Sequence, residues 1–478
     1  MKTKIAINGF GRIGRNAFKI AYERSDLEIV AINDLTDTKT LAHLLKHDSN
    51  YGAYQHEVSF DETNLIVEGQ KIKVLSEKDP AKLPWGDLGV QVVIESTGFF
   101  VDPAKAKAHI EAGAKKVIIS APAKGEGAET IVIGVNEDKA AEAGEIISNA
   151  SCTTNCITPV MGVLEANFGI EKAMMTTVHS YTASQVLQDG PAKDLREARS
   201  AAINIVPTTT GASIAAAKAL PALEGIFGGM SVRVPTPVVS LSDFVVVTKK
   251  TVTVDEVNEA FKKAAADPYY QGILDITEDE LVSSDFIGNS HSAIVDLKLT
   301  AVVGGNLLKV VAWYDNEWGY SNRLVELTAD VGQLLNSDGQ SNDTSSRKPD
   351  DPVPSTAPKL PDDDDSKTPA NSSDNDKADE DYKKDEKPKF SIPVDEPLVE
   401  EPDSAHEDLL EAPKLESLDH QPQEDKDDRA AGGDNAQGAA YIISGEKDSV
   451  KAEDHPTSDI PTPKLPPDAT NIDGIRHF

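Results

Sequence analysis

Three glycines in the sequence Gly9-Phe10-Gly11-Arg12-Ile13-Gly14 restrict the fold of this chain more than any other feature. They directly follow a short apolar run, Lys4–Asn8, and they open a segment with helical periodicity, Gly14–Ser25. In such a strand–loop–helix unit, one glycine permits the tight turn, one lets the backbone approach a pyrophosphate, and one lets the helix pack on the strand. The pattern predicts a parallel β-α-β unit that binds a dinucleotide.

Asp34 supports this prediction, because it lies 20 residues after Gly14 at the end of a second apolar run, Leu27–Asn33. A carboxylate at this place hydrogen-bonds the adenosine ribose hydroxyls and repels a 2′-phosphate, so the cofactor is expected to be NAD and not NADP. The alternative to a dinucleotide site is an ordinary β-α turn in which Asp34 is only solvated.

The alternation of strand-like and helix-like segments changes near residue 150. Val90–Glu95, Pro103–Ala112 and Lys116–Ser120 continue the parallel pattern of the first part. Later runs of β-branched residues favour a mixed or antiparallel sheet backed by helices. The runs are Val238–Thr248, Val295–Val303 and Leu307–Trp313. The expected helices are Cys152–Phe168 and Val254–Ala266. We predict an α/β chain with a Rossmann dinucleotide-binding domain (1–151), an α+β catalytic domain (152–314) and a C-terminal helix (315–336) that returns to the first domain.

The composition changes again after Asn336. Residues 337–478 contain 37 Asp and Glu against 16 Lys and Arg, a net charge of −21, and 17 of the 28 prolines. Such a segment buries too little apolar surface to offset the cost of ordering its backbone, about 1–2 kcal/mol per residue. We therefore predict a disordered acidic tail that recruits a protein partner through short apolar segments such as Phe390–Val399 and Leu409–Leu418. The alternative to partner recruitment is a solvated acidic segment that has no specific partner.

Several classes of partner and location are disfavoured by the composition. The acidic balance argues against nucleic acid, because phosphate contacts need Lys and Arg. No run approaches the length of a membrane span and no signal peptide is evident, so a cytoplasmic protein without a membrane partner is expected. The two cysteines, Cys152 and Cys156, favour a reducing compartment and supply too few ligands for a metal site.

A nucleophile and a base can be assigned from two short segments. Cys152 lies at a predicted helix start, where the helix N-terminus and a neighbouring imidazolium can lower the pKa of a thiol. His179, at the end of an apolar run, is the candidate base. For Cys156, one helical turn further on, a buried inert thiol remains the expectation.

Six motifs together resemble the glyceraldehyde-3-phosphate dehydrogenase family: INGFGRIGR, SNASCTTNC, HSYT, PTTTGAS, RVPTPVVS and WYDNEWGYS. They occur in the family's order over residues 1 to about 336. The resemblance implies NAD-dependent oxidation of D-glyceraldehyde 3-phosphate with inorganic phosphate to 1,3-bisphosphoglycerate, in glycolysis and gluconeogenesis. It also implies that Cys152 carries a thiohemiacetal and then a thioester, that His179 accepts the protons, and that the enzyme is a homotetramer.

The same resemblance implies the binding residues. For the substrate phosphate and the attacking phosphate they are Ser151, Thr153, Thr182, Arg199, Thr210, Gly211 and Arg233, with Arg196 as an alternative to Arg199. For NAD they are Gly9, Gly11, Arg12, Ile13, Gly14, Asp34, Lys78, Thr97, Ser120 and Asn316. Pro191 agrees with a preference for NAD, whereas the loop from Ala183 to Lys193 departs from the family's commonest form.

Two other functions remain possible. Erythrose-4-phosphate dehydrogenase uses the same Cys and His, although the retained PTTTGA segment favours the phosphorylating triose enzyme. An interaction protein built on a retired enzyme core is the second, and the intact nucleophile and base argue against it.

Overall fold

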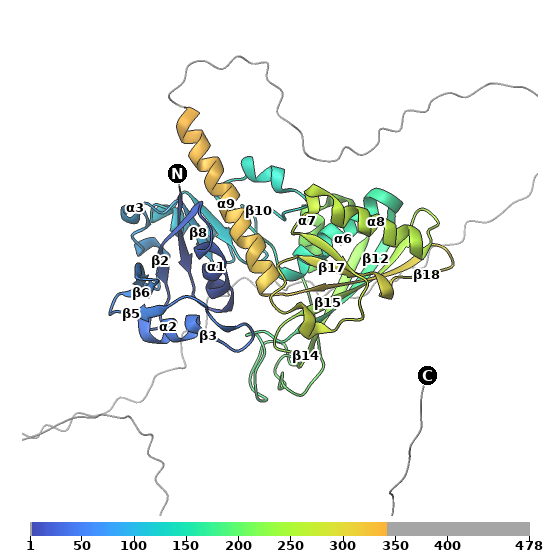
Figure 1. Cartoon of the computed structure of the whole chain (residues 1–478), viewed down its shortest axis with the longest axis horizontal. Helices are drawn as coiled ribbons and strands as arrows, with labels where there is room; N and C mark the ends of the chain where they lie inside the picture. Colours follow the sequence, from blue (N-terminus) through green and yellow to red (C-terminus); the bar gives the residue numbers. More distant parts are fainter. Residues whose placement is uncertain (1, 342–478) are drawn as a thin grey trace, which may run out of the picture. The chain divides into compact units, whose positions relative to one another are not determined.

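The computed structural model describes residues 2–341; Met1 and residues 342–478 lie outside the described residues. The disorder predicted for the acidic tail therefore falls on residues that are not described, except for Ser337–Ser341, which continue the last helix. Within the described residues the strands form two large sheets, one in the first half of the chain and one in the second, together with a pair of two-residue strands (Figure 1).

The first sheet has the strand order β10-β11-β9-β8-β1-β2-β7-β6-β5. Its strands are β1 (Thr3–Asn8), β2 (Leu27–Asn33), β5 (Val58–Phe60), β6 (Asn64–Val67), β7 (Gln70–Leu75), β8 (Val92–Glu95), β9 (Lys116–Ile119), β10 (Glu129–Thr130) and β11 (Ile146–Ser148). Pairing is parallel from β10 to β7 and antiparallel from β7 to β5. The chain order reverses between β1 and β8, which is where open α/β sheets bind ligands.

The second sheet is mixed and has the order β13-β14-β12-β15-β19-β17-β16, with β18 paired to β19. Its strands are β12 (Ile170–Ser180), β13 (Val206–Thr208), β14 (Phe227–Val234), β15 (Ser240–Thr248), β16 (Leu274–Thr277), β17 (Ala293–Asp296), β18 (Ala301–Val303) and β19 (Leu307–Tyr314). The short strands β3 (His47–Asp48) and β4 (Gly52–Ala53) pair only with each other.

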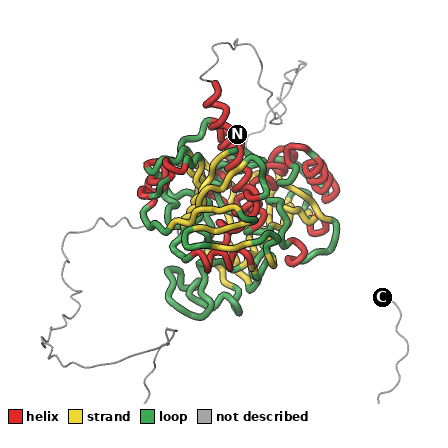
Figure 2. The backbone as a smooth tube through the Cα atoms, turned by 60° about the vertical axis from the view of Figure 1, so that its left-hand side comes forward, coloured by secondary structure: helices red, strands yellow, loops and turns green. Residues whose placement is uncertain are grey.

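Helices cover the sheets, as the red segments around the yellow strands in Figure 2 show. They are α1 (Arg12–Tyr22), α2 (Thr38–Lys46), α3 (Trp85–Leu88), α4 (Pro103–Ala106), α5 (Ala108–Glu111), α6 (Cys152–Phe168), α7 (Ala212–Ala219), α8 (Val254–Ala266) and α9 (Trp318–Ser341). Single turns of 3-10 helix are η1 (Pro80–Lys82), η2 (Glu137–Ala141), η3 (Pro221–Leu223), η4 (Pro268–Tyr270), η5 (Ser283–Phe286) and η6 (Leu297–Leu299).

The last helix packs against the first sheet. Leu324, Leu327 and Val331 of α9 lie in the same buried cluster as Ile5 and Ile7 of β1, and α9 runs beside α1 (Figure 1, orange). A second cluster, around Val160 of α6 and Phe244 of β15, fills the space between the other sheet and its helices. The segment 181–205 between β12 and β13 contains neither helix nor strand and is a long loop.

Local sequence explains several element ends. The Ser151 side chain accepts a hydrogen bond from Thr154 N and so caps α6. Thr253 and Glu256 form a capping box at the start of α8. The run Val295–Val303, expected as one strand, is divided into β17, η6 and β18, and the helix expected over 103–112 is divided into α4 and α5. No helix in the described residues is long and apolar enough to cross a membrane.

Candidate active site

The three glycines after β1 occupy three different environments. Gly9 has a φ of +92°, and a Cβ there would lie 2.7 Å from Thr97 N, so the turn excludes other residues. A Cβ on Gly14 would lie 2.1 Å from Gly9 O, because α1 starts against the loop. A Cβ on Gly11, in contrast, would meet no protein atom within 4 Å. The open space beside Gly11, at the start of α1, fits the approach of a pyrophosphate to free helix amides.

A cavity of about 520 Å³ adjoins this loop at the carboxyl ends of β1, β2 and β8. It is lined by four of the predicted cofactor residues besides Gly11: Gly9, Asp34, Lys78 and Thr97. The Asp34 carboxylate accepts hydrogen bonds from Phe10 N (2.8 Å) and Thr36 N (3.0 Å), which fix it at the rim. The size suits a small-molecule ligand, and the donors and carboxylate suit an adenosine, so the residues present fit NAD.

The other predicted cofactor residues lie outside the lining of this cavity: Arg12, Ile13, Gly14, Ser120 and Asn316. Ser120 follows β9, and its N–H donates to Glu95 O at 2.9 Å. Ile13 is partly buried and packs against the first hydrophobic cluster.

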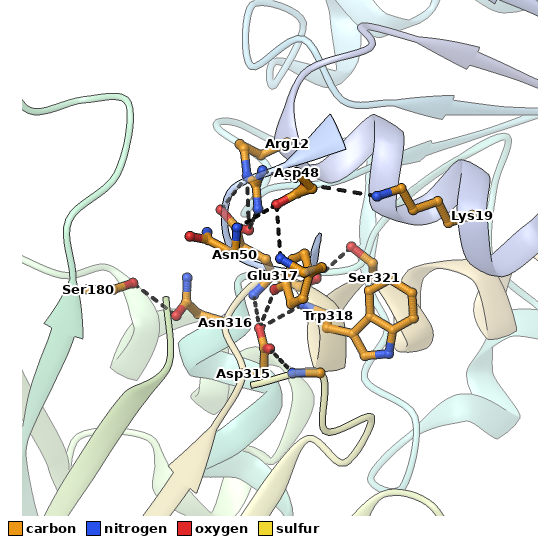
Figure 3. Close-up of polar contacts among 12 residues, drawn as sticks. Arg12, Lys19, Asp48, Asn50, Ser180, Asp315, Asn316, Glu317, Trp318 and Ser321 are labelled. Carbon is orange, nitrogen blue, oxygen red and sulfur yellow. Dashed lines mark hydrogen bonds and ion pairs between the residues drawn. The ribbon is translucent and has the colours of Figure 1, made fainter. Parts of the chain in front are cut away.

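The Arg12 side chain does not lie free beside the glycine loop (Figure 3). Its guanidinium donates to Asp48 Oδ2 at 2.7 Å and to both carboxylate oxygens of Glu317. Burial lowers the pKa of Arg12, but the two carboxylates outweigh this effect and the pKa lies above its usual range. Arg12 therefore joins the glycine loop to the residue that follows Asn316.

Asn316 is held by two serines. Its Oδ1 accepts hydrogen bonds from Ser180 Oγ and Ser240 Oγ, both at 3.0 Å, and Figure 3 shows the first of these contacts. The Ser240 hydroxyl also accepts the Ser180 N–H at 3.2 Å. With the oxygen engaged, the side-chain NH2 of Asn316 is the group that can bind a carboxamide.

Cys152 and His179 are in direct contact, with 3.4 Å between Sγ and Nε2. The His179 Nδ1 lies 2.7 Å from Ser180 O. A carbonyl only accepts, so Nδ1 carries the proton and Nε2 presents its lone pair to the thiol. Cys152 is the first residue of α6, where backbone N–H groups have no partner within the helix. The pair has the geometry of a nucleophile and its general base.

Burial dominates the ionisation of this pair. It raises the pKa of the Cys152 thiol, which Arg233 lowers to a smaller extent. It lowers the pKa of His179 to about 3, and the charge of Arg233 acts in the same direction. The lowered thiol pKa expected from the helix N-terminus is thus opposed by desolvation. Proton transfer from Sγ to Nε2 creates opposite charges in contact, which stabilise each other, so the two groups ionise as a pair.

The backbone is strained at two points next to these residues. Ala150, two residues before Cys152, has a φ of +54°, and Val239, directly before Ser240, has a φ of +70°. For a β-branched residue this conformation is a true outlier, and such strain concentrates at functional sites. Here the strained residues lie beside Cys152 and beside Ser240, the serine whose hydroxyl donates to Asn316.

The predicted anion-binding residues are only partly brought together. Arg233 Nη1 approaches Ser180 O at 3.5 Å, which places it beside His179. Thr182 shares a cavity with Arg12 and Glu317. Arg199 instead pairs with Asp189 at 2.8 Å in the long loop, and no contact among the described residues joins it to Arg233.

Four other predicted phosphate ligands lie at helix starts. Ser151 caps α6, and the Thr153 hydroxyl is 3.1 Å from Tyr314 OH. Thr210 Oγ1 accepts from Ala212 N, and Gly211 is the N-cap of α7, with open space where a Cβ would be. Helix N-termini of this kind are suited to anions.

The sequence did not single out the residues that support the site. Ser180 and Ser240 lie within the motifs HSYT and RVPTPVVS, but nothing in the motifs ranks them above their neighbours. Asp48 and Glu317 are ordinary acids in the sequence, and their role depends on contacts of Arg12 across 36 and 305 positions. Among the described residues, no group of three His, Cys, Asp or Glu could hold a metal ion.

Comparison with known proteins gives a consistent result. Residues 3–103 match the glyceraldehyde 3-phosphate dehydrogenase NAD binding domain, and residues 151–316 match the C-terminal domain of the same enzyme. The chain is 57% identical over 337 residues to glyceraldehyde-3-phosphate dehydrogenase of Streptomyces coelicolor, covering 70% of this chain and 100% of the relative. The enzyme of Geobacillus stearothermophilus is 56% identical over 330 residues, covering 69% of this chain and 98% of the relative.

Proposed function

The chain belongs to the glyceraldehyde-3-phosphate dehydrogenase family, and we propose that Cys152 and His179 carry out the family's reaction in it. The protein is an NAD-dependent oxidoreductase that acts on glyceraldehyde 3-phosphate. The contact of 3.4 Å between Sγ and Nε2 is the observation that supports the residue assignment.

The first step is the formation of a thiohemiacetal. His179 Nε2 accepts the thiol proton as Sγ attacks the aldehyde carbon, so that a C–S bond forms and the carbonyl π bond breaks. The free amides at the start of α6 stabilise the negative oxygen, which then takes the proton back from Nε2.

The second step is the oxidation. When bound beside Asn316, NAD would supply the acceptor for the hydride of the substrate carbon. His179, neutral again, takes the hydroxyl proton, and the carbon becomes the carbonyl of a thioester on Cys152. A phosphate oxygen then attacks this carbonyl, the C–S bond breaks, and the thiolate recovers a proton from His179.

We propose the binding residues on the same basis. The NH2 of Asn316 would hold the nicotinamide carboxamide, and the carboxylate of Asp34 the ribose hydroxyls, with the other cofactor residues being Gly9, Gly11, Arg12, Ile13, Gly14, Lys78, Thr97 and Ser120. Arg233 and Thr182 would hold the substrate phosphate, whereas Ser151, Thr153, Thr210 and Gly211 would hold the attacking phosphate. Arg199 would have to leave Asp189 to contribute.

Family membership implies an oligomer, and we propose a homotetramer located in the cytoplasm. One face of the second sheet supports association, because apolar side chains are exposed there on neighbouring strands. Met174 of β12, 65% exposed, lies directly opposite Val245 of β15, 43% exposed. Exposed apolar patches of this kind mark interfaces between proteins. The two free cysteines agree with a reducing compartment.

The domain boundaries at residues 151 and 314 remain part of the proposal, as does recruitment of a partner by the acidic segment. The relatives are covered almost completely by the matched 330 to 337 residues, so this segment lies outside the match.

A single-turnover measurement tests the proposed chemistry. Without inorganic phosphate, the thioester should persist on Cys152, so NADH should appear in a burst close to one per subunit and then stop. Added phosphate should restore continuous turnover. Continuous NADH production without phosphate would contradict the mechanism, and faster turnover of erythrose 4-phosphate than of glyceraldehyde 3-phosphate would favour the alternative enzyme.

A further inference from the structure

The turn that leads into α6 is supported by side chains from outside the turn. Ala150 is fully buried and has a φ of +54°, a left-handed conformation that is unfavourable for alanine because its Cβ crowds the following carbonyl. Its N–H donates to Ser148 Oγ at 3.1 Å, and its carbonyl accepts a hydrogen bond from the Tyr320 hydroxyl at 3.1 Å. These two contacts fix the peptide groups before and after Ala150.

Asn155 holds the same turn from within α6. Its side chain is buried, and its Nδ2 donates to Asn149 O at 2.9 Å and to Ser151 O at 3.0 Å. These are the carbonyls of the two residues that flank Ala150. Because a carbonyl oxygen can only accept, both hydrogen bonds come from the NH2 of the amide, which fixes the direction in which the amide faces. One side chain therefore spans the strained turn.

The carbonyl of Ser151 sets the direction of the Cys152 N–H. The two groups belong to one trans peptide bond, so they point in opposite directions. With the carbonyl held by Asn155, the N–H points away from Asn155. Burial raises the pKa of the Cys152 thiol, and after Arg233 the N–H groups of Cys152 and Thr153 are among the groups that lower it. The N–H that Asn155 orients is thus one that acts on the nucleophile.

We propose that Asn155 is a positioning residue for the nucleophile: it keeps the turn at Ala150 in its strained form and directs the Cys152 N–H toward the oxygen that becomes negative during the reaction. This inference rests on the proposed role of Cys152. Without the two hydrogen bonds from Asn155, the turn relaxes toward a conformation that alanine prefers. Cys152 and its N–H then shift relative to His179, whereas the cavity beside the glycine loop keeps its form.

Asn155→Ala tests the proposal, with Asn167→Ala as the matched control. Asn167 lies near the other end of α6, and its Nδ2 also donates to a backbone carbonyl, Val163 O at 2.7 Å. Asn155→Ala should lower kcat about 10–100-fold, the effect of misplacing a reacting group by about 1 Å, while the Kd for NAD changes less than about twofold. Asn167→Ala should change neither value. An unchanged kcat in Asn155→Ala, or an equal loss in both variants, would overturn the proposal.

Ala150→Gly provides a rescue that a role of Asn155 in packing alone does not predict. Glycine adopts a positive φ without strain, so the turn keeps its form with less support from Asn155. The double variant Ala150→Gly/Asn155→Ala should have a kcat at least about fivefold above that of Asn155→Ala. If Asn155→Ala does not fold, the double variant should fold and retain a kcat within about fivefold of Ala150→Gly alone. Absence of recovery, or a double variant that also does not fold, would contradict the role of Asn155.

A rapid-mixing measurement without phosphate separates this inference from the proposed function. The unaltered enzyme should give a burst of NADH, and Asn155→Ala should give a burst of the same size that forms more slowly, because Cys152 is present but misplaced. A burst of equal rate in both proteins would overturn the role of Asn155 alone. No burst in the unaltered enzyme would overturn the proposed function and this inference with it.

Discussion

Cys152 and Cys156 lie one turn apart on α6, and their surroundings predict opposite results of substitution. Cys152 contacts His179, whereas Cys156 is fully buried in the second hydrophobic cluster, where burial raises the pKa of its thiol. Cys152→Ala should reduce kcat by at least about 10⁴-fold, because no nucleophile remains, while NAD binding persists.

Cys156→Ala is the matched control. It should retain most activity and lower the free energy of unfolding by about 1 kcal/mol, the cost of a small cavity. Steady-state kinetics and urea unfolding of both variants check this assignment, and a similar collapse of kcat in Cys156→Ala would show that the nucleophile is misassigned.

The proposed role of Asp34 is to determine the choice of cofactor. Asp34→Ala should raise KM for NAD by about 10–100-fold, the loss of one charged hydrogen bond, and should improve the use of NADP. The Asp34 carboxylate also accepts hydrogen bonds from Phe10 N and Thr36 N. The variant Asp34→Asn therefore removes the negative charge while keeping a side chain of the same size in the same place. Kinetics with both cofactors provide the test, and comparable use of NAD and NADP by the unaltered enzyme would disprove the assignment.

Asp48 provides a test of pH dependence. Burial raises the pKa of this carboxyl, but hydrogen bonds from Asn50 N and Arg12 outweigh it, and the pKa lies below its usual value. A depressed carboxyl pKa contributes stability above the unfolded pKa, near 4, and this stability is lost as pH falls through the folded pKa. Asp48→Asn should therefore lower the free energy of unfolding by about 1–3 kcal/mol at pH 7.

The difference should decrease below pH 4. Urea midpoints of the two proteins at pH 7 and pH 3 give the comparison. A difference that stays the same at both values would mean that Asp48 stabilises the protein by packing and not by its charge.

At this scale the sequence pointed to the proposed nucleophile and base more clearly than to the residues that hold them in place. Cys152 and His179 belong to recognisable motifs, and the structure brings them into contact. Ser180 is the residue through which His179, Arg233 and Asn316 are connected, yet this role follows only from the packing of β12 between β14 and β15. The pairing of Arg199 with Asp189 was likewise beyond prediction, because it depends on the path of a loop.

Among the elements, the glycine loop and α1 offer a paired test. Gly11→Ala places a methyl group in open space, so the melting temperature should change little while the affinity for NAD falls about tenfold or more. Gly14→Ala places a Cβ 2.1 Å from Gly9 O, so both the melting temperature and NAD binding should decrease. Calorimetry and cofactor titration distinguish the two. A large loss of stability in Gly11→Ala would mean that this glycine serves the fold and not the ligand.

Elements with strong local signals were predicted closely. The helices over Cys152–Phe168 and Val254–Ala266 have capping residues at their starts, and both have the predicted bounds. The antiparallel strands β5 to β7 and the strand β14 were not predicted. Their segments are short, polar or rich in glycine, as in Phe227–Val234, and they become strands because a neighbouring strand supplies hydrogen-bond partners.

For the whole molecule, the exposed apolar face of the second sheet predicts that subunits associate. Val245→Lys places a charge opposite Met174 and should dissociate the assembly, lowering the mass measured by sedimentation at micromolar concentration. Val282→Lys, at a valine that is 60% exposed in a loop, is the control and should leave the mass unchanged. An unchanged mass for Val245→Lys would place the interface elsewhere.

The position of α9 has a consequence for biosynthesis. The first hydrophobic cluster combines β1 with α9, so the core beside β1 is complete only after α9, which follows the whole second sheet in the sequence, has left the ribosome. At about 5–20 residues per second, the 137 codons that follow Ser341 take roughly 7–27 s to translate. During that interval α9 leaves the exit tunnel while the chain is still attached. Translation of these later codons thus gives α9 time to pack against β1 while the chain is still attached to the ribosome.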